Sequence, residues 1–445
     1  MLRPVSYPLL AALLAASLGV LAACGPGEDP DLDFHRGVNA LEEGRAERAR
    51  AHFAADLERH PERAESWRLA GDAWRSGRLQ SLTRGVEHWR RYLELEPGDD
   101  EVALRITRTL FLLGEWRQAE AWCERLDDGP RSQLLRARVF LEADPARAEA
   151  AIAAALAAAA DDPLVQATAA RIYQQTGDPE RAMTHAGRAV ELDPLDLRST
   201  YLLARLTQRR GDAEEAAELL ATHQLLVRLT GAGSVPEPTP AEALRLLREL
   251  EPRLHGEALS FRREKLRLLV KNGRRREARA VLAGLAGAGL PAAARLELAG
   301  LAEKLGELAT ARGLLDSVLD EEPAAEELAA GGNAREALFG LALLAYNSGD
   351  RPRARELVED ALQRFPHAAR FHHLAGRLEL DDGRREEAAR SFERALELAP
   401  WKSDCRIDLA NLWLAAGRSD DVGALLAAAP EADPAIAAYR RRHGL

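Results

Sequence analysis

Small and apolar residues recur along this chain at spacings of three and four residues. Ala388, Phe392 and Ala395 form one such series, and these spacings place the three side chains on one face of an α-helix. Small residues on that face let neighbouring helices approach closely, while the phenylalanine fills the space between them. A glycine precedes the series and a proline follows it, as with Gly383 and Pro400. The pattern predicts short helices that alternate with tight turns.

The turn glycines recur at nearly constant intervals along the sequence. The intervals are 33 or 34 residues, and the glycines that show them are Gly44 and Gly77, Gly177 and Gly211, and Gly349, Gly383 and Gly417. Self-similarity at such a period indicates a stacked helical repeat. One helix pair cannot bury its apolar face alone, so adjacent units supply the core and each unit is expected to contact only its neighbours. We therefore predict an all-α solenoid.

Residues 371–400 contain the most complete version of the pattern. It consists of a small residue in the first helix, a turn glycine and a small-aromatic-small series closed by proline, at Gly376, Gly383, Ala388, Phe392, Ala395 and Pro400. These residues and spacings resemble the tetratricopeptide repeat (TPR). A second unit opens with Trp67, Ala70, Gly71 and Trp74, which is similar to the first helix of that family. The resemblance implies a right-handed superhelical solenoid of helix-turn-helix repeats, in which the first helix of each unit lines a concave groove.

The resemblance extends over residues 31–434, with about eleven units of uneven quality. Residues 230–240 are too rich in proline and glycine to be helical. We expect this loop to separate an N-terminal solenoid at 31–229, with about six units of which one is degenerate, from a C-terminal solenoid at 241–434. Residues 435–445 are expected to cap the array.

The N-terminus has the organisation of a secretory signal peptide at residues 1–23. Arg3 precedes an apolar run from about residue 9 to residue 22, which is too short to span a membrane. The run ends in Leu-Ala-Ala-Cys, which resembles a bacterial lipobox, where cleavage precedes a cysteine that becomes lipidated. We expect Cys24 to be that cysteine and residues 24–30 to be a short tether. The alternatives are a secreted protein cleaved elsewhere and a cysteine present there by chance.

Gly25 would be the second residue of the mature chain. By analogy with enteric bacteria, a residue other than aspartate at this position favours sorting to the outer membrane. The expected location is therefore the bacterial cell envelope, with a lipid anchor in the outer membrane and the solenoid facing the periplasm.

Composition excludes several classes of function. The chain has 61 basic and 71 acidic residues, a net charge of −10, so binding of nucleic acid is not expected. Cys123 and Cys405 fall at interior helix positions and are expected to be small core residues. His372 and His373 are adjacent on one helix and point in different directions, so they are not proposed as ligands. We find no motif for a catalytic residue, a metal site or a cofactor, and we expect the protein not to be an enzyme.

The groove positions of the repeat, in contrast, carry a distinctive set of side chains. In the second to sixth units the inward sites are occupied by guanidinium and amide groups and one tyrosine, at Arg68, Arg75, Arg108, Arg171, Gln174, Gln175, Arg198, Tyr201, Arg205, Gln208 and Arg209. Arginine forks suit carboxylates of a peptide or of a uronic polymer. The alternative is codon usage, because the chain has only four lysines against 57 arginines and any exposed basic site will be arginine.

Resemblance to membrane-anchored TPR proteins gives the leading hypothesis for function. The chain is expected to be a scaffold or adaptor lipoprotein that holds envelope proteins through its groove, in a process such as polysaccharide export, pilus assembly or outer-membrane protein assembly. The carboxylate clamp of chaperone-binding members is not reproduced, because its paired lysine and asparagine sites are missing. The alternative is that the arginine-lined groove binds an anionic polysaccharide or cell-wall polymer.

Overall fold

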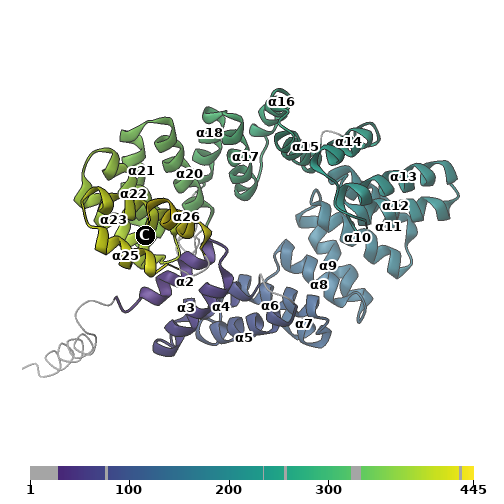
Figure 1. The fold of residues 1–445 in the computed structure, drawn as a ribbon. Coiled ribbons are helices and arrows are strands. Elements are labelled where there is room, and N and C mark those ends of the chain that lie inside the picture. The colour runs from purple at the N-terminus through teal and green to yellow at the C-terminus, as the bar shows by residue number, and fades with distance from the viewer. Residues whose placement is uncertain are drawn as a thin grey trace, which may run out of the picture. The chain divides into compact units, whose positions relative to one another are not determined.

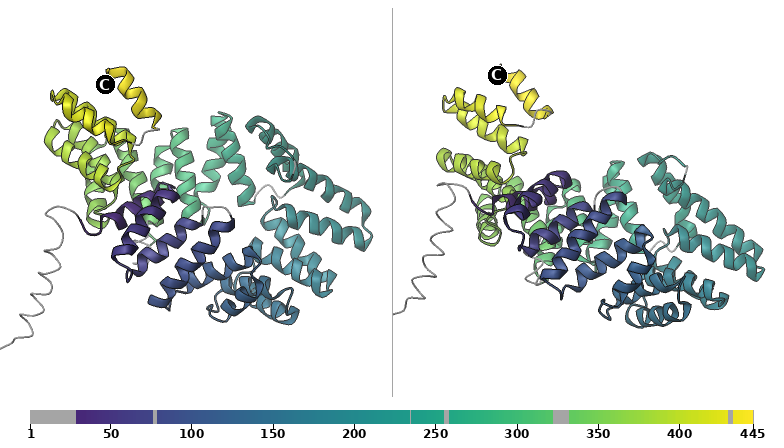
Figure 2. Two further views of the ribbon diagram at one scale, coloured as in Figure 1. Left: turned by 60° about the horizontal axis from the view of Figure 1, so that its bottom comes forward. Right: turned by 90° about the horizontal axis from the view of Figure 1, so that it is seen from below.

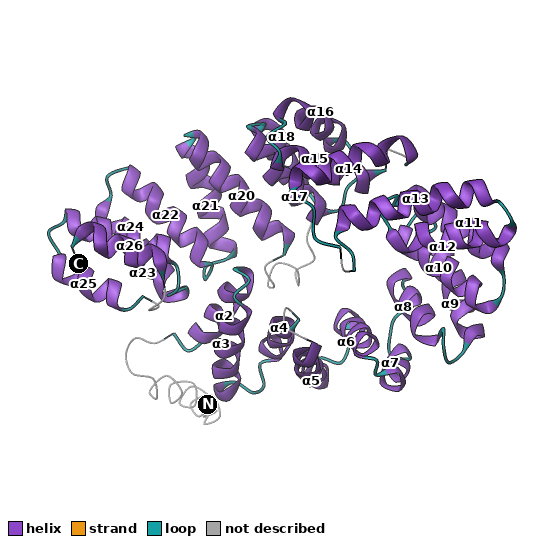
Figure 3. Ribbon diagram, turned by 45° about the vertical axis from the view of Figure 1, so that its right-hand side comes forward, coloured by secondary structure: helices purple, strands orange, loops and turns teal. Residues whose placement is uncertain are grey.

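The computed structural model describes residues 29–75, 79–233, 235–254, 258–321, 332–429 and 433–444. These residues form helices joined by short connections, and no strand occurs among them (Figure 3). The all-α prediction and the stacked helix pairs are therefore confirmed. Within the same residues, none of the helices combines the length and the apolar character needed to cross a membrane. Cys24, Gly77 and most of the predicted tether lie outside the described residues.

Contacts between residues divide the chain into two compact units. Unit 1 combines Met1–Ser76 with Val358–Leu445, and unit 2 is Gly77–Leu357. The loop predicted at 230–240 lies inside unit 2, between helices that end at Thr230 and begin at Pro240. Whether 31–229 and 241–434 behave as separate solenoids stays a prediction.

Both units are built from consecutive antiparallel helices, labelled in Figure 1. The helices of unit 1 are α2 (Leu32–Glu42), α3 (Ala46–Arg59), α4 (Ala64–Trp74), α22 (Ala369–Asp381), α23 (Arg385–Leu398), α24 (Ser403–Ala415), α25 (Ser419–Ala427) and α26 (Pro434–His443). Those of unit 2 are α5 (Leu79–Leu95), α6 (Asp100–Leu113), α7 (Trp116–Cys123), α8 (Pro130–Phe140), α9 (Pro145–Ala158), α10 (Pro163–Thr176), α11 (Pro179–Leu192), α12 (Leu197–Arg210), α13 (Ala213–Thr230), α14 (Pro240–Leu250), the 3₁₀ turn η1 (Glu251–Arg253), α15 (Leu259–Lys271), α16 (Arg275–Ala286), α17 (Ala292–Leu305), α18 (Leu308–Leu319) and α20 (Asn333–Ser348). The boundary between the units falls within α21 (Arg351–Arg364).

The predicted turn glycines explain where many of the first helices end. Each one in the described residues has a positive φ, as Gly177 (89°), Gly211 (105°) and Gly383 (78°) illustrate. An L-residue with a side chain rarely adopts this conformation, so glycine stops the helix and lets the chain reverse. The repeat period therefore reflects a backbone requirement that returns once in each helix pair.

Small residues and phenylalanines on the paired helices meet as predicted. A β-carbon added to Gly376 would lie 2.6 Å from the ring of Phe392, and one added to Gly37 would lie 2.6 Å from the ring of Phe53. In both pairs the glycine belongs to the first helix and the phenylalanine to the second, so the same contact occurs in the first and the tenth repeat. Ala388, at 0% exposure, packs in the same core as Phe392.

The residue at the first position of the repeat makes the same contact in two units. Trp67 Nε1 donates to the Pro61 carbonyl at 2.9 Å, and His372 Nε2 lies 2.8 Å from the Pro366 carbonyl. A tryptophan and a histidine thus make the same contact with the proline that closes the preceding helix. His372 therefore takes part in a contact within the repeat array.

Both cysteines of the described residues are buried and free. Cys123 is 1% exposed and Cys405 is 0% exposed, as predicted for small core residues. Burial raises the pKa of the Cys123 thiol to about 12 and raises that of Cys405 as well. Neither thiol is therefore a reactive nucleophile at neutral pH.

Unit 1 contradicts the expectation that each repeat contacts only its sequence neighbours. Its first helix, α2, packs against α23 and the start of α22, which come from near the other end of the chain (Figures 1 and 2). Phe53, Leu398 and Trp401 share one core there, and Arg36 Nε donates to the Glu397 carbonyl at 2.8 Å. The sequence pattern specifies an apolar face for each helix but not which distant helix covers it.

Asn39 provides the most specific contact between the two segments. Its amide nitrogen donates to the carbonyls of His35 and His367, each at 2.8 Å, and its oxygen accepts from the Ala369 N–H at 2.9 Å. The side chain is 3% exposed, so water cannot replace these bonds. One buried amide therefore satisfies three backbone groups on both sides of the junction.

Replacing Asn39 tests the junction between the chain ends. Asn39→Ala leaves the Ala369 N–H and the His367 carbonyl buried without this partner, and we expect a loss of about 2–3 kcal/mol in unfolding free energy. Chemical denaturation measures the loss in unfolding free energy. Faster amide hydrogen exchange in α2 shows that the loss arises at this junction. Asn347→Ala is the control because Asn347 is exposed. Equal unfolding free energies for the two variants would contradict the assignment.

Candidate functional site

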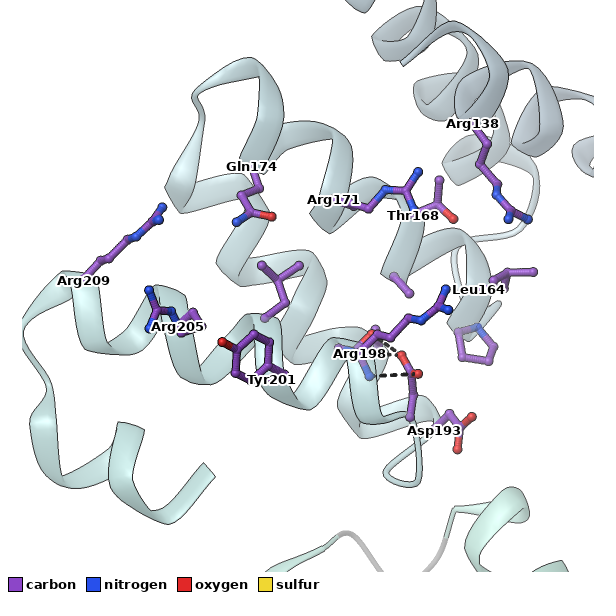
Figure 4. Close-up of a pocket in the computed structure, with 16 residues that line it drawn as sticks. Arg138, Leu164, Thr168, Arg171, Gln174, Asp193, Arg198, Tyr201, Arg205 and Arg209 are labelled. Carbon is purple, nitrogen blue, oxygen red and sulfur yellow. Dashed lines mark hydrogen bonds between the residues drawn. The ribbon is translucent and has the colours of Figure 1, made fainter. Parts of the chain in front are cut away.

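A hollow of about 570 Å³ opens on unit 2, on the side formed by α8, α10 and α12 (Figure 4). These are the first helices of three consecutive helix pairs, the helices that the repeat pattern places on the groove. The hollow is lined by arginines, one tyrosine, aliphatic residues, uncharged polar residues and two aspartates, at Arg138, Pro163, Leu164, Ala167, Thr168, Arg171, Gln174, Ala189, Asp193, Asp196, Arg198, Ser199, Tyr201, Leu202, Arg205 and Arg209.

The structure brings together six of the eleven predicted groove residues at this hollow. They are Arg171, Gln174, Arg198, Tyr201, Arg205 and Arg209. In Figure 4 the four residues of α12 lie along one face of that helix, opposite Arg171 and Gln174 of α10. Helical spacing accounts for this, because residues 198, 201, 205 and 209 are three or four apart.

The remaining predicted positions do not line the hollow. Gln175 donates to Glu142 at 3.2 Å, and Gln208 and Arg108 are exposed side chains of unit 2 outside the lining of the hollow. Arg68 and Arg75 belong to unit 1, where Arg68 pairs with Glu65 and Arg75 lies 3.9 Å from Asp72. These assignments as groove ligands stay predictions.

Aspartate caps fix the starts of the two helices that carry most of the site. Asp162 accepts hydrogen bonds from the N–H groups of Leu164 and Val165 at the start of α10. Asp196 accepts from those of Arg198 and Ser199 at the start of α12. Such caps satisfy backbone donors that a helix leaves free at its N-terminus. They also occupy much of the hydrogen-bonding capacity of Asp196, which lies at the edge of the hollow.

Sequence reasoning missed Arg138, which also lines the hollow. It lies in residues 131–162, the degenerate unit without a turn glycine, and the pattern assigned no groove position there. A signal exists nevertheless, since Arg138, Arg171 and Arg205 follow one another at the interval of the turn glycines. The repeat period continues through the degenerate unit although the turn residue does not.

The pKa of Arg138 reflects both its burial and the positive charges around it. Burial lowers the pKa of its guanidinium, and the positive charges of Arg171, Arg108 and Arg198 lower that pKa further. The side chain lies over the ring of Phe111, with its guanidinium carbon 5.0 Å from the ring centre, an arrangement that holds the cation in place. Four guanidinium groups from four successive first helices are therefore close enough to repel one another.

The arginines of this surface are not paired with acidic residues. Among the described residues, no carboxylate forms an ion pair with Arg108, Arg138, Arg171, Arg198, Arg205 or Arg209. Elsewhere in unit 2 such pairs are frequent: Arg188 pairs with Asp161 and Glu191. On α12 itself, Arg210 pairs with Asp212 and Glu215, just beyond the unpaired Arg209.

The distribution of acidic residues explains the contrast. Helices α8, α10 and α12, with 11, 14 and 14 residues, contain no Asp or Glu, although the chain has 71 such residues in 445. The intervening second helices α9, α11 and α13 do contain glutamates. Codon usage explains why the basic residues are arginine rather than lysine. It does not explain why carboxylates are absent from these three consecutive first helices.

Unit 1 contains a second group of polar side chains, Asp29, His35 and His367, whose ligand-type atoms lie within 4.8 Å of one another. The two imidazole rings are stacked, with centres 3.5 Å apart and planes 10° from parallel, so their in-plane lone pairs do not converge on one point. Arg394 lies 3.1 Å from His367 Nδ1 and 3.5 Å from Asp29, which places a positive charge among them. This geometry fits a packing contact and not a cation site.

Burial and nearby positive charge lower the pKa of both rings of this stack. Burial lowers the pKa of His35 to about 4, with a further contribution from His367. Burial and Arg394 lower the pKa of His367. Asp29 and Asp31 act in the opposite direction on both rings without reversing the shift.

Comparisons with known proteins agree with the repeat pattern. Two family models described as tetratricopeptide repeat match, one at residues 167–225, 264–326 and 339–400 and the other at 379–441. Together they cover about half of the chain. No curated protein matches the sequence.

Solved structures with similar folds have low sequence identity. PilW, a type IV pilus biogenesis factor, is 16% identical, with 47% of this chain and 97% of that chain covered and a TM-score of 0.40. The Cut9–Hcn1 assembly of the APC/C is 12% identical over 96% of this chain and 98% of that one, with a TM-score of 0.33. MamA from Desulfovibrio magneticus RS-1 is 19% identical, with 47% of this chain and 100% of that chain covered and a TM-score of 0.29.

Repulsion among the unpaired arginines gives a prediction about stability. Arg171→Gln removes one of the like charges around Arg138 and breaks no ion pair, so we expect the midpoint of thermal unfolding to stay the same or rise by about 1 °C. Arg188→Gln, which removes a paired arginine, is the control and is expected to lower the midpoint or leave it unchanged. Scanning calorimetry measures both. A clear loss of stability in Arg171→Gln alone would mean that Arg171 has a structural partner.

The stacked histidines give a prediction about pH. Because the folded pKa of His35 is about 4 and its ordinary value is 6.5, the unfolded chain binds a proton first as the pH falls through this interval. The contribution of His35 to the free energy of unfolding is therefore fully present above about pH 6.5 and declines as the pH falls toward 4. Thermal unfolding of the His35→Gln variant should depend less on pH in this range. An unchanged pH profile in that variant would show that the stack does not contribute.

Proposed function

Since the chain belongs to the tetratricopeptide repeat family, whose arrays act as protein-interaction scaffolds, we propose that it is a membrane-anchored scaffold lipoprotein of the bacterial envelope. The observation that carries the proposal is the hollow on unit 2. Its arginines have no intramolecular acidic partner among the described residues, and its Leu164 and Tyr201 side chains are 53% and 47% exposed. This surface has unpaired charges and exposed apolar groups, and it lies on the helices that form the groove in stacked repeats. Such a surface is suited to binding a partner protein.

The membrane anchor in this proposal is a lipid on Cys24. Its support is the sequence Leu-Ala-Ala-Cys at the end of a short apolar run. Two or three acyl chains on one residue attach a protein lastingly to a membrane, whereas one chain does not. The seven residues from Gly25 to Asp31 precede α2, and they span at most about 25 Å when extended. The repeats would therefore act close to the membrane surface, which we propose is the periplasmic face of the outer membrane.

Within the envelope, a scaffold of this kind serves assembly or export. Polysaccharide export, pilus assembly and outer-membrane protein assembly all require several proteins to be held together at a membrane. The support for this group of processes is the combination of a repeat array with the proposed anchor.

A second candidate follows from the same arginines. Guanidinium groups bind the carboxylates of uronic polymers as well as those of proteins, so an anionic polysaccharide or cell-wall polymer is an alternative ligand of the groove. Titration with a uronic polymer at rising salt tests it, since binding that depends on charge weakens as salt screens the interaction.

Crosslinking in the native envelope tests the anchored scaffold. We expect the chain to fractionate with membranes and to recover a defined envelope protein, and we expect Cys24→Ala to lose both properties. Cys123→Ala is the matched control, because it removes a buried thiol and leaves the lipidation site in place. Membrane fractionation that is the same for Cys24→Ala and the control would exclude the anchor, and recovery of glycan in place of protein would favour the second candidate.

A further inference from the structure

We infer that the hollow on unit 2 binds an acidic polypeptide segment, with carboxylates on the arginines of α8, α10 and α12 and apolar side chains on Leu164, Leu202 and Tyr201. This inference rests on the proposed function, that the chain is a protein scaffold, and specifies the chemical class of its partner. It combines the charge, the spacing and the apolar content of the hollow.

Charge is the first argument. The arginines at the hollow lack acidic partners among the described residues, and they lie on three helices that contain no Asp or Glu. A buried or half-buried cation next to other cations is unfavourable in the free protein, as the repulsion around Arg138 shows. A ligand that brings several carboxylates removes this repulsion and forms charge-assisted hydrogen bonds. The site is thus organised to favour an anion with several charges over one with a single charge.

Spacing is the second argument. Arg205 and Arg209 are one turn apart on α12, which corresponds to about 6 Å along the helix axis. Alternate side chains of an extended polypeptide are about 6.6 Å apart on the same side, and residues one turn apart on a helix are about 6 Å apart. Carboxylates at either spacing can therefore reach both guanidinium groups at once. Arg171 on the facing helix α10 provides a third contact across the hollow (Figure 4).

Apolar content is the third argument, and it separates a polypeptide from a polysaccharide. Leu164 and Tyr201 are exposed between the arginines, and Ala167 and Leu202 extend the same surface. A tyrosine ring can stack on a sugar as well as on an apolar side chain. Aliphatic leucines, in contrast, gain stability by covering apolar groups, and Leu or Phe residues of an acidic segment supply far more apolar area than the C–H faces of uronic acid rings.

Asp193 and Asp196 limit the cationic surface at one edge. Asp196 is engaged in capping α12, and Asp193 accepts from the Leu195 N–H at 3.2 Å. Both are acidic side chains that line the hollow. The acidic residues of the ligand are therefore expected along α8, α10 and the later turns of α12, with a neutral or basic residue at the edge near Asp193.

Fluorescence anisotropy with three short labelled peptides tests the inference on the full-length chain with Cys24→Ala, purified without its anchor. One peptide alternates Glu with Leu and Phe, a second has Gln in place of every Glu, and a third has Ser in place of every Leu and Phe. We expect the first to bind, with affinity that falls as salt rises, and the other two to bind about tenfold more weakly or less. An oligogalacturonate is the fourth probe and is expected to bind more weakly than the first peptide.

Matched variants locate the binding. The triple variant Arg138→Gln, Arg171→Gln and Arg205→Gln removes three unpaired charges from the hollow, and we expect at least about a tenfold loss of affinity for the first peptide. The control triple Arg91→Gln, Arg188→Gln and Arg210→Gln removes the same net charge from arginines that already have acidic partners. It is expected to bind the peptide within about twofold of the unsubstituted chain. Circular dichroism checks that both triples remain folded.

Each other outcome overturns the inference in a specific way. Equal losses in the two triples would show attraction by overall charge alone. Stronger binding of oligogalacturonate than of the acidic apolar peptide would show a glycan site, and failure of every peptide to bind would remove the polypeptide ligand. None of these results depends on the lipid anchor. Conversely, a Cys24 without a lipid would contradict the proposed membrane location and would leave peptide binding intact.

Discussion

In the helix pairs α2–α3 and α22–α23, a phenylalanine ring of the second helix occupies the space that a β-carbon of the first helix would need. The rings of Phe53 and Phe392 reach within 2.6 Å of such an atom at Gly37 and Gly376. This close approach sets how far apart the paired helices lie and which face of each one is buried. The side chains on the opposite face of each first helix then take no part in this core, so their chemistry can be chosen for another purpose.

In unit 2, three consecutive first helices have a distinctive composition on the side that takes no part in the core. Helices α8, α10 and α12 contain no Asp or Glu, and the guanidinium groups at the hollow have no carboxylate partner among the described residues. Glu191 of α11 and Glu215 of α13, in contrast, pair with Arg188 and Arg210. Unpaired like charges contribute no stability to the fold. Their arrangement on three consecutive first helices is the observation from which we infer an external anionic partner, because neither folding nor codon usage accounts for it.

The features that could be predicted from the sequence are those that depend on local contacts. Gly177 and Gly383 end helices through their own backbone conformation, and Cys123 is buried because its helical neighbours are. Six of the eleven groove residues also meet at the hollow, since helical spacing alone aligns them. Arg138 was missed because a degenerate turn interrupted the pattern used to find it. The contact of Asn39 with His367 and Ala369 could not be predicted, because an apolar face does not specify which distant helix covers it.

The construction of unit 1 from both ends of the chain determines the order in which the protein can fold. During synthesis, α2 to α4 emerge first, but the helices that complete their core follow only after the whole of unit 2. Repeats of unit 2 have mostly local contacts and can fold as they are made, whereas unit 1 must close a very long loop, which slows folding. Until Val358 and the residues after it are available, Phe53 and its neighbours lack part of their covering, and a chain that ends early cannot complete its first repeat.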